Sequence, residues 1–433
     1  MSTVTRTATS TDSYVTRRLS VIGSFDAADD RDEKAERNCQ DNDAEAIQRS
    51  EHGKDLSPAP LVYQAPSKGM QWVGSQLGLK EPSDVWTISV VLLCLGVNVY
   101  IWTHASAMSP LQLLGTWLLL VQLTASVSTI VHNTIHYNIF YNPMHNRIFH
   151  LLLTICFGHP VCTFVSAHNL SHHRYTQMAE DHMRTTQMRY KYHLWNYMCF
   201  FGRVGNVIAA SDMRYMRLMK RQGKRIWTEF ALQMSTVVVM HVFCALTNPL
   251  YWIVFWNGPR MAASIFITNM NMLQHDGCAK PINASAKDPL HKSPGAGQLA
   301  PIHIVNVNTS RNFTGFITNA LFFNNGYHGI HHIKPTLHWS KLPQAHAYYV
   351  KPHIHPNLDQ VNMLTYFVRT FVFNQRTLYT GEAYHPDQMD GPVEPENENW
   401  IQYPAEFEFI AKEAPQLVML DILDDIRALL LGK

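Results

Sequence analysis

The chain has 433 residues, of which 16% are charged, and its formal net charge is +2 at pH 7. This length allows one large or two ordinary domains, and the nearly balanced charge gives no global attraction to nucleic acid. Seven scattered cysteines without a CxxC pair argue against a disulfide framework and against a cysteine zinc site. The N-terminal and C-terminal parts of the sequence are polar and the central part is strongly apolar, so the central part determines the class of protein.

Residues 1–70 are rich in Ser, Thr, Asp and Glu and poor in large apolar residues, a composition that predicts a disordered segment. The first 25 residues hold three arginines and one acidic residue, which faintly suggests an organelle transit peptide. A disordered tail without a targeting role is the alternative, and the apolar core of a secretory signal is not found there.

Four apolar stretches, at 85–102, 111–131, 226–246 and 249–270, predict four transmembrane helices arranged as two hairpins. Each is close to the roughly 20 residues that cross a hydrocarbon core. Asp84 is predicted to cap the first helix, and Gly258 and Pro259 predict a kink in the fourth.

The shorter apolar stretch 148–164 is interrupted at Gly158 and Pro160, which favours an interfacial or re-entrant segment. Basic residues accumulate over 184–225, so the positive-inside rule places this loop on the cytoplasmic or stromal side. Within the second hairpin, Glu229 is expected to snorkel near a helix end and His241 to be an ordinary core residue. Arg260 either snorkels or marks a functional polar path.

Nine of the 24 histidines form three clusters and one satellite, each cluster directly beside an apolar stretch and all predicted on the basic side of the membrane. They are His132 and His136; His168, His172 and His173; His328, His331 and His332; and His275. Spacings of three and four residues place side chains on one helix face, so each cluster can direct its imidazoles at a common point. One such pair is weak evidence, but three matched clusters indicate a metal centre at a membrane surface.

Eight or nine imidazoles are too many for one tetrahedral zinc ion, so two metal ions are implied. Two irons can activate dioxygen, which permits attack on an unactivated C–H bond. Because the surroundings are apolar, the expected substrate is a membrane-soluble acyl chain or a similarly apolar molecule.

The segments HNTIH, HNLSHH and GYHGIHH, followed by IKPTLHWSKLPQAH, resemble the histidine boxes of the membrane-bound fatty acid desaturase and hydroxylase superfamily. The resemblance covers about residues 85–350. It implies an all-α integral membrane protein in which four transmembrane helices lie under a cytosolic helical cap that carries the boxes. It also implies a non-haem di-iron centre that uses O2 and electrons from an external donor.

Position by position, the resemblance assigns metal binding and catalysis to the eight box histidines and identifies His275 as an additional ligand. Asn271 is similar to a family asparagine that contacts iron through water, with a polar helix end as the alternative. Structural framing is expected from Gly326, Tyr327, Trp339 and Pro343.

Two departures bear on the substrate. The first box has Asn133 where many relatives have an acidic residue, and the third begins with His328 where front-end desaturases usually have Gln. No HPGG haem motif occurs, so the electrons are expected from a separate cytochrome b5 or ferredoxin. The expected location is the endoplasmic reticulum membrane, with a plastid membrane as the alternative.

The predicted domains are a disordered segment at 1–70, a desaturase domain at 71–350 and a cytosolic cap or tail at 351–433. The tail holds an amphipathic stretch at 361–373 and an apolar run at 417–431.

Three functions are compatible with these features. The first is an acyl-lipid desaturase, and the second is a hydroxylase or ketolase acting on an acyl chain, a sphingoid base or a carotenoid. The third is a histidine-rich metal transporter, which is expected to carry ionisable residues along its transmembrane helices. These helices are nearly free of Asp and Glu, which argues against a transporter. An inactive lipid-binding relative is expected to have lost at least one box histidine, and none is missing. The sequence therefore favours the enzymes.

Overall fold

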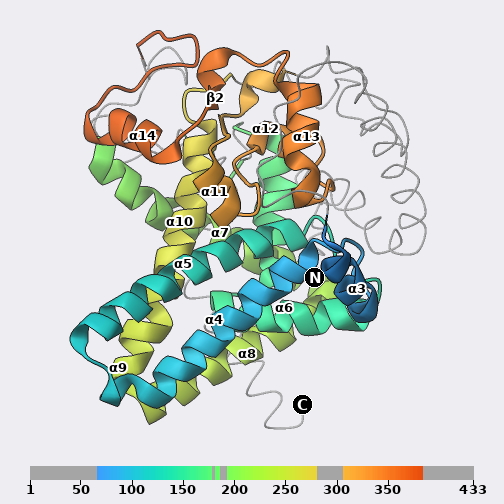
Figure 1. Cartoon of the computed structure of the whole chain (residues 1–433), viewed down its shortest axis with the longest axis vertical. Helices are drawn as coiled ribbons and strands as arrows, with labels where there is room; N and C mark the ends of the chain where they lie inside the picture. The colour runs from blue at the N-terminus through green and yellow to red at the C-terminus, as the bar shows by residue number, and fades with distance from the viewer. Residues whose placement is uncertain (1–65, 178–180, 186–192, 280–305, 384–433) are drawn as a thin grey trace, which may run out of the picture.

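The computed structural model describes residues 66–177, 181–185, 193–279 and 306–383, and these residues are mostly helical. In Figure 1 the long helices α4, α5, α6 and α8 fill the lower part, and the short elements α11 to α14 gather above them. Helix α10 runs from the lower part into the upper one. Most of the predicted disordered segment 1–70 lies outside the described residues. Helix α3 (Lys68–Leu77) begins within the last residues of this predicted segment.

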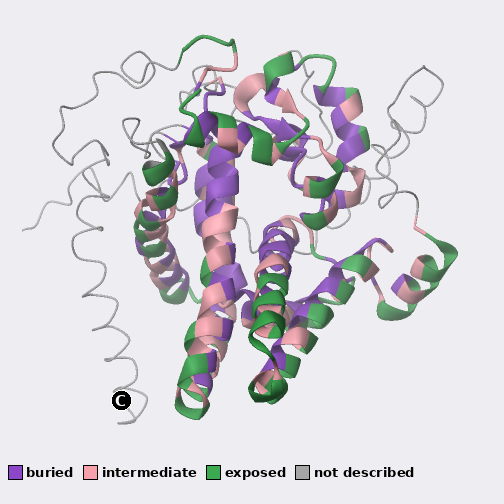
Figure 2. Cartoon of the chain, turned by 60° about the vertical axis from the view of Figure 1, so that its left-hand side comes forward, coloured by how far each residue is buried: buried purple, intermediate pink, exposed green. Residues whose placement is uncertain are grey.

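Three helices are long and apolar enough to cross a membrane. These are α4 (Asp84–His104) with its short extension η3 (Ala105–Ala107), α5 (Pro110–Thr134) and α8 (Arg225–Thr247). Leu92 and Val99 on α4 and Val239 on α8 are exposed. Exposed apolar side chains of this kind suit a lipid environment, and Figure 2 shows exposed residues concentrated toward the lower ends of the long helices. The chain is therefore a membrane protein.

The interrupted apolar stretch forms two helical segments bent by 95°. Helix α6 (Pro143–Phe157) ends at Gly158, whose φ is 79°, and η4 (Val161–Thr163) leads into the π-helix η5 (Val165–His173). A Cβ at position 158 would lie 2.5 Å from Cδ of Arg260, so both the backbone conformation and the available space require glycine. The predicted break is confirmed, and the bent pair is either a broken span or a re-entrant segment.

The fourth predicted crossing, 249–270, is not among the described helices that qualify as spans. This region is helical as α9 (Pro249–Tyr251), the π-helix η7 (Trp252–Asn257) and α10 (Gly258–His275). The polar residues Arg260, Asn269 and Asn271 of α10 are buried and lower its apolar character. The predicted irregularity near Gly258 is confirmed as the change from π-helix to α-helix.

The polar residues of the second predicted hairpin have structural partners. Arg260 donates hydrogen bonds to the carbonyls of Ile155 (2.7 Å) and Trp256 (2.8 Å) and lies over the Trp256 ring. It therefore satisfies backbone groups where α6 and the π-helix end. Glu229 forms an ion pair with Arg147 (2.6 Å).

Helix α4 does not begin as predicted. Asp84 is its first helical residue, and the cap position is held by Ser83. The carboxylate of Asp84 is buried and accepts hydrogen bonds from residues distant in the chain, so it is an anchor between segments rather than a helix cap.

The upper part contains the long helix α7 (His193–Arg221) and many short elements. Strands β1 (Asn312–Phe313) and β2 (Asp359–Gln360) pair in parallel. The remaining elements are η10 (Val307–Thr309), α11 (Phe316–Leu321), α12 (His328–Ile333), η11 (Trp339–Lys341), α13 (Leu342–Ala345), η12 (His346–Val350), η13 (Pro356–Leu358), α14 (Met363–Phe367) and η14 (Val368–Val372).

Part of the predicted tail packs against the helices. The guanidinium of Arg376 pairs with the buried carboxylate of Asp276 at the end of α10. The predicted amphipathic stretch 361–373 corresponds to α14 and η14, whereas the predicted apolar run 417–431 lies outside the described residues. The segment 351–383 is thus tied to the end of α10, the helix that carries His275.

Candidate metal centre

The nine predicted histidines lie together, in two groups that do not follow the sequence clusters. The first group contains five and the second four, and within each group the ligand-capable nitrogens lie within 4.8 Å of one another. The first group is His132, His136, His168, His173 and His331, and the second is His172, His275, His328 and His332.

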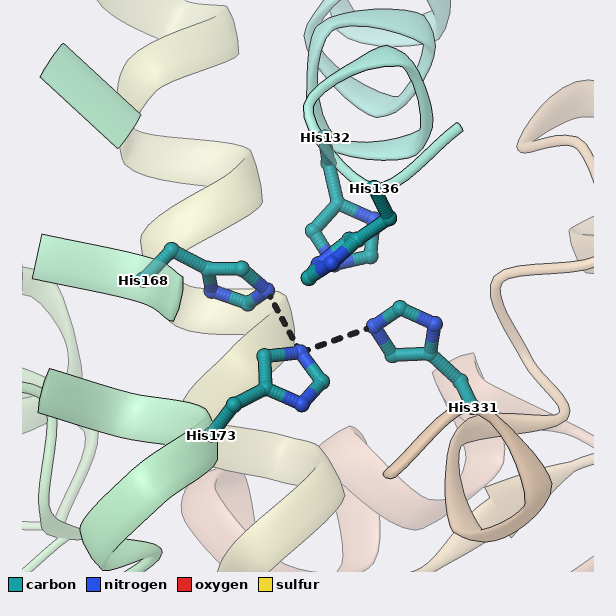
Figure 3. Close-up of side chains that lie close together, drawn as sticks. All are labelled: His132, His136, His168, His173 and His331. Carbon is teal, nitrogen blue, oxygen red and sulfur yellow. Dashed lines mark hydrogen bonds between the residues drawn. The ribbon is translucent and has the colours of Figure 1, made fainter. Parts of the chain in front are cut away.

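The first group joins α5, η5 and α12. Figure 3 shows its five rings directed toward a common centre. His173 Nε2 lies 2.9 Å from His168 Nε2 and 3.0 Å from His331 Nε2. His168 and His173 are five residues apart, which is about one turn of a π-helix, so the π-helical form of η5 aligns them.

The second group joins η5, α10 and α12. His275 Nε2 lies 3.0 Å from His328 Nε2 and 3.1 Å from His332 Nε2, and the latter two are 3.0 Å apart. His328 and His332 occupy one face of α12 because they are four residues apart.

The expectation that each sequence cluster points at one centre is wrong for the second and third clusters. Neighbours in a helix point in different directions, so the tandem pair His172 and His173 divides between the two groups. The pair His331 and His332 divides in the same way. The tandem histidines therefore link the two groups.

The arrangement fits metal ions better than it fits hydrogen bonds. A neutral Nε2 either donates or accepts, so among the three mutually close Nε2 atoms of His275, His328 and His332 at least two are of the same kind and repel. A cation between them satisfies all three lone pairs. Ligands at right angles with metal–nitrogen distances of about 2.1 Å are roughly 3.0 Å apart, which matches the observed spacing.

The protonation state of the third box also suits metal binding. Burial lowers the pKa of His328, His331 and His332 well below the usual value, and neighbouring imidazoles lower it further. These rings are neutral at pH 7 and present lone pairs. The buried Nε2 atoms of His136 and His172 have no hydrogen-bond partner in the described part of the chain.

Outer partners orient several rings. His275 Nδ1 lies 2.9 Å from the carbonyl of Thr309, which fixes the proton on Nδ1 and leaves the lone pair on Nε2, as metal binding requires. His132 Nδ1 lies 3.2 Å from Oδ1 of Asn133. Asn133, the departure in the first box, thus takes the orienting role in this chain.

Asp181 is an orienting residue that the sequence patterns did not identify. Its carboxylate lies 3.0 Å from His172 Nδ1 and accepts backbone N–H groups of Gln177 and Met183, each at 2.8 Å. Burial opposes ionisation of Asp181, but the interaction with His172 and these hydrogen bonds outweigh it, and its pKa falls to about 2. An acidic residue eight positions after a tandem His pair is the only sequence clue.

Asn271 lies one turn before His275 on α10. Its amide nitrogen is 3.5 Å from the Met183 carbonyl, and its buried Oδ1 has no partner within the described residues. This oxygen is suited to hold a water molecule beside the second group.

A cavity of about 230 Å³ reaches both groups. Its walls include His132 and His168 of the first group and His328 of the second, together with Asn271. The rest of the wall is largely apolar and includes Phe157, Phe164, Ile208 and Ile267. A largely apolar cavity thus lies beside both histidine groups.

The comparison with known families agrees with this geometry. The family model described as fatty acid desaturase matches residues 108–363, more than half of the chain, and this range includes all nine histidines. No curated protein matches the chain. The chain belongs to the fatty acid desaturase family and is an oxidoreductase of that family.

Proposed function

We propose that this protein is a membrane-bound, non-haem di-iron acyl-lipid desaturase that introduces a C=C double bond into a lipid acyl chain. The observation that carries the proposal is that two groups of imidazoles, one of five and one of four, lie beside a largely apolar cavity. Family membership supports it, since the family uses two irons.

In this proposal one iron is held by His132, His136, His168, His173 and His331, and the other by His172, His275, His328 and His332, with Asn271 contributing through water. The two irons supply the O2 activation that attacks a C–H bond. The overall reaction converts –CH2–CH2– with O2, two electrons and two protons into –CH=CH– and two water molecules.

The protein's own part is to bind and position. Apolar side chains such as Phe164 and Ile267 exclude water from the chain, and His132, His168 and His328 border the same cavity. Asp181 and the Thr309 carbonyl hold His172 and His275 in the tautomer that presents Nε2.

The electrons are proposed to come from a separate cytochrome b5 or ferredoxin, and the enzyme is proposed to reside in the endoplasmic reticulum membrane, with a plastid membrane as the alternative. The catalytic and ligand assignment of the nine histidines belongs to the same proposal.

The second candidate is a hydroxylase or ketolase of the same superfamily acting on an acyl chain, a sphingoid base or a carotenoid. The same site serves this reaction, because oxygen transfer requires the same metal centre and an equally apolar cavity. A metal transporter is not proposed, because family membership assigns the site to an oxidoreductase.

The deciding experiment expresses the chain in yeast, supplies a panel of fatty acids and analyses total lipids by gas chromatography with mass spectrometry. The wild type is compared with His331→Ala, which lacks one ligand of the first group. A product lighter by two hydrogens and absent from the variant supports desaturation, and a product heavier by one oxygen supports hydroxylation. Unaltered product formation by the variant contradicts the ligand assignment.

A further inference from the structure

Buried carboxyl groups around the metal centre differ in their hydrogen bonding. Asp181 and Asp84 each accept three hydrogen bonds. Asp212 on α7 is equally buried, with 4% exposure, but within the described residues its only hydrogen-bond partner is the hydroxyl of Ser166. A buried carboxylate with so little support is costly when ionised.

Asp212 faces the cavity that reaches the metal centre. Gly205, Ile208, Ala209 and Asp212 line it from α7, and their spacing of three and four residues places them on one helix face. The contact with Ser166 also places Asp212 beside η5, the π-helix that carries the second histidine box.

The hydrogen bonds of Ser166 give an ionised Asp212 only weak support. Ser166 Oγ lies 3.1 Å from the Thr163 carbonyl and also contacts Oδ1 of Asp212. A hydroxyl has one hydrogen, so the hydrogen that Ser166 donates is shared between the Thr163 carbonyl and Asp212.

Burial raises the pKa of Asp212 to about 8, although the hydrogen bond from Ser166 acts in the opposite sense. The titratable groups around it are His132, His159, His168 and His328, which line the same cavity, and Cys162 of η4, on which its charge acts. Glu229 of α8 also acts on Cys162, and it is paired with Arg147. None of the described residues forms an ion pair with Asp212, so the hydrogen bond from Ser166 alone opposes the effect of its burial.

We propose that Asp212 is the general acid that supplies a proton to the oxygen reduced in this cavity. The inference rests on the proposed function, in which each O2 is reduced to two waters by two electrons, two hydrogens of the substrate and two protons from water. The carboxyl of Asp212 releases a proton as its O–H bond breaks and an oxygen–hydrogen bond of water forms.

Other groups at the centre are less suited to this role. The histidines use their lone pairs for metal binding, and Asp181, whose pKa is about 2, is an anion. The cavity has room for a water molecule that can return a proton to Asp212, because it holds about 230 Å³ and one water molecule needs only about 10–15 Å³.

The test compares purified, iron-loaded full-length enzyme with Asp212→Asn. Asparagine keeps the shape and the hydrogen-bonding capacity but has no transferable proton. Turnover is expected to fall about 100-fold or more, with iron content and KM unchanged and more O2 consumed per product. Asp212→Glu is expected to restore part of the turnover, and Asn206→Ala, on the exposed face of the same helix, is expected to have no effect.

A second readout needs no turnover. Infrared spectroscopy of the metal-free protein is expected to show a protonated carboxyl band that disappears as the pH rises through about 8 and is missing from Asp212→Asn. Ser166→Ala is expected to move this midpoint to higher pH. Activity of the wild type should fall over the same pH range.

Normal turnover and O2 coupling in Asp212→Asn, or absence of the infrared band from the wild type, overturns the inference while the desaturase proposal stands. A wild type that transforms no lipid with O2 overturns the proposed function and this inference together. If Asp212 merely binds a polar group of the substrate, KM rises in Asp212→Asn while the O2 coupling stays unchanged.

Discussion

Asp84 and Trp339, 255 residues apart in the chain, are joined by a hydrogen bond of 3.0 Å from the indole N–H to the buried carboxylate. His338 Nε2 lies 3.1 Å from the other carboxylate oxygen. Because Trp339 closely follows the third histidine box, this contact fixes the segment after α12 to the first residue of α4. A carboxylate at the beginning of the first membrane helix therefore helps to position the third box.

We predict that Asp84→Ala lowers the free energy of unfolding by about 2–3 kcal/mol, because hydrogen bonds to a buried charged group are lost. Iron content should fall as well, since the third box loses its anchor. Thermal unfolding in detergent and metal analysis measure both effects. The control is Glu81→Gln, since the partly exposed Glu81–Lys341 pair (2.8 Å) joins the same two segments and should be worth less than about 1 kcal/mol. Equal losses in the two variants contradict the anchoring role.

The division of the tandem histidines predicts that neighbouring substitutions affect different ions. His173→Ala removes a ligand of the first group and His172→Ala one of the second. Each variant should lose about one of two irons, and Mössbauer spectra of the remaining iron should differ between them. Identical spectra contradict two separate groups.

The sequence identified all nine histidines because their spacing and their position beside apolar stretches are local features. It did not divide them correctly, because the division depends on the π-helical form of η5 and on how α12 faces α10. These relationships arise from packing between distant segments. Asp181 and Asp212 were missed for the same reason, because a single acidic residue shows its role only when its burial and its partners are known.

Three of the four predicted stretches form helices that are long and apolar enough to cross a membrane, whereas 249–270 is divided among α9, η7 and α10. The stretch 249–270 is apolar on average, but Arg260 and Asn269 lie buried against neighbouring elements rather than toward lipid. Hydropathy reports composition and cannot distinguish a helix that faces lipid from one that lines a polar centre. Asp84 was taken for a cap because its partner, Trp339, is distant in sequence.

Asp181 provides a test of ring orientation. In Asp181→Asn one amide nitrogen replaces an oxygen that accepts hydrogen bonds, so His172 is held less well. We expect iron affinity to fall about 10- to 100-fold, as is usual for outer partners of metal-binding histidines. Competition with a chelator measures the change. Arg174→Gln, an exposed position next to the second box, should retain the wild-type affinity.

Two glycines on α7 provide a matched test of the cavity as the acyl-chain site. Gly205 lines the cavity, whereas Gly202 is exposed and is not part of its wall, and a Cβ at either position meets nothing within 4 Å. A side chain can therefore begin at both positions without a clash at Cβ, and leucine favours the helix over glycine by about 0.8 kcal/mol. In Gly205→Leu the side chain occupies cavity volume, so conversion of the longest chains should fall relative to shorter ones while iron content stays unchanged. Gly202→Leu should keep the wild-type product profile. Lipid analysis after feeding chains of graded length measures both variants, and an unchanged profile in Gly205→Leu places the acyl chain elsewhere.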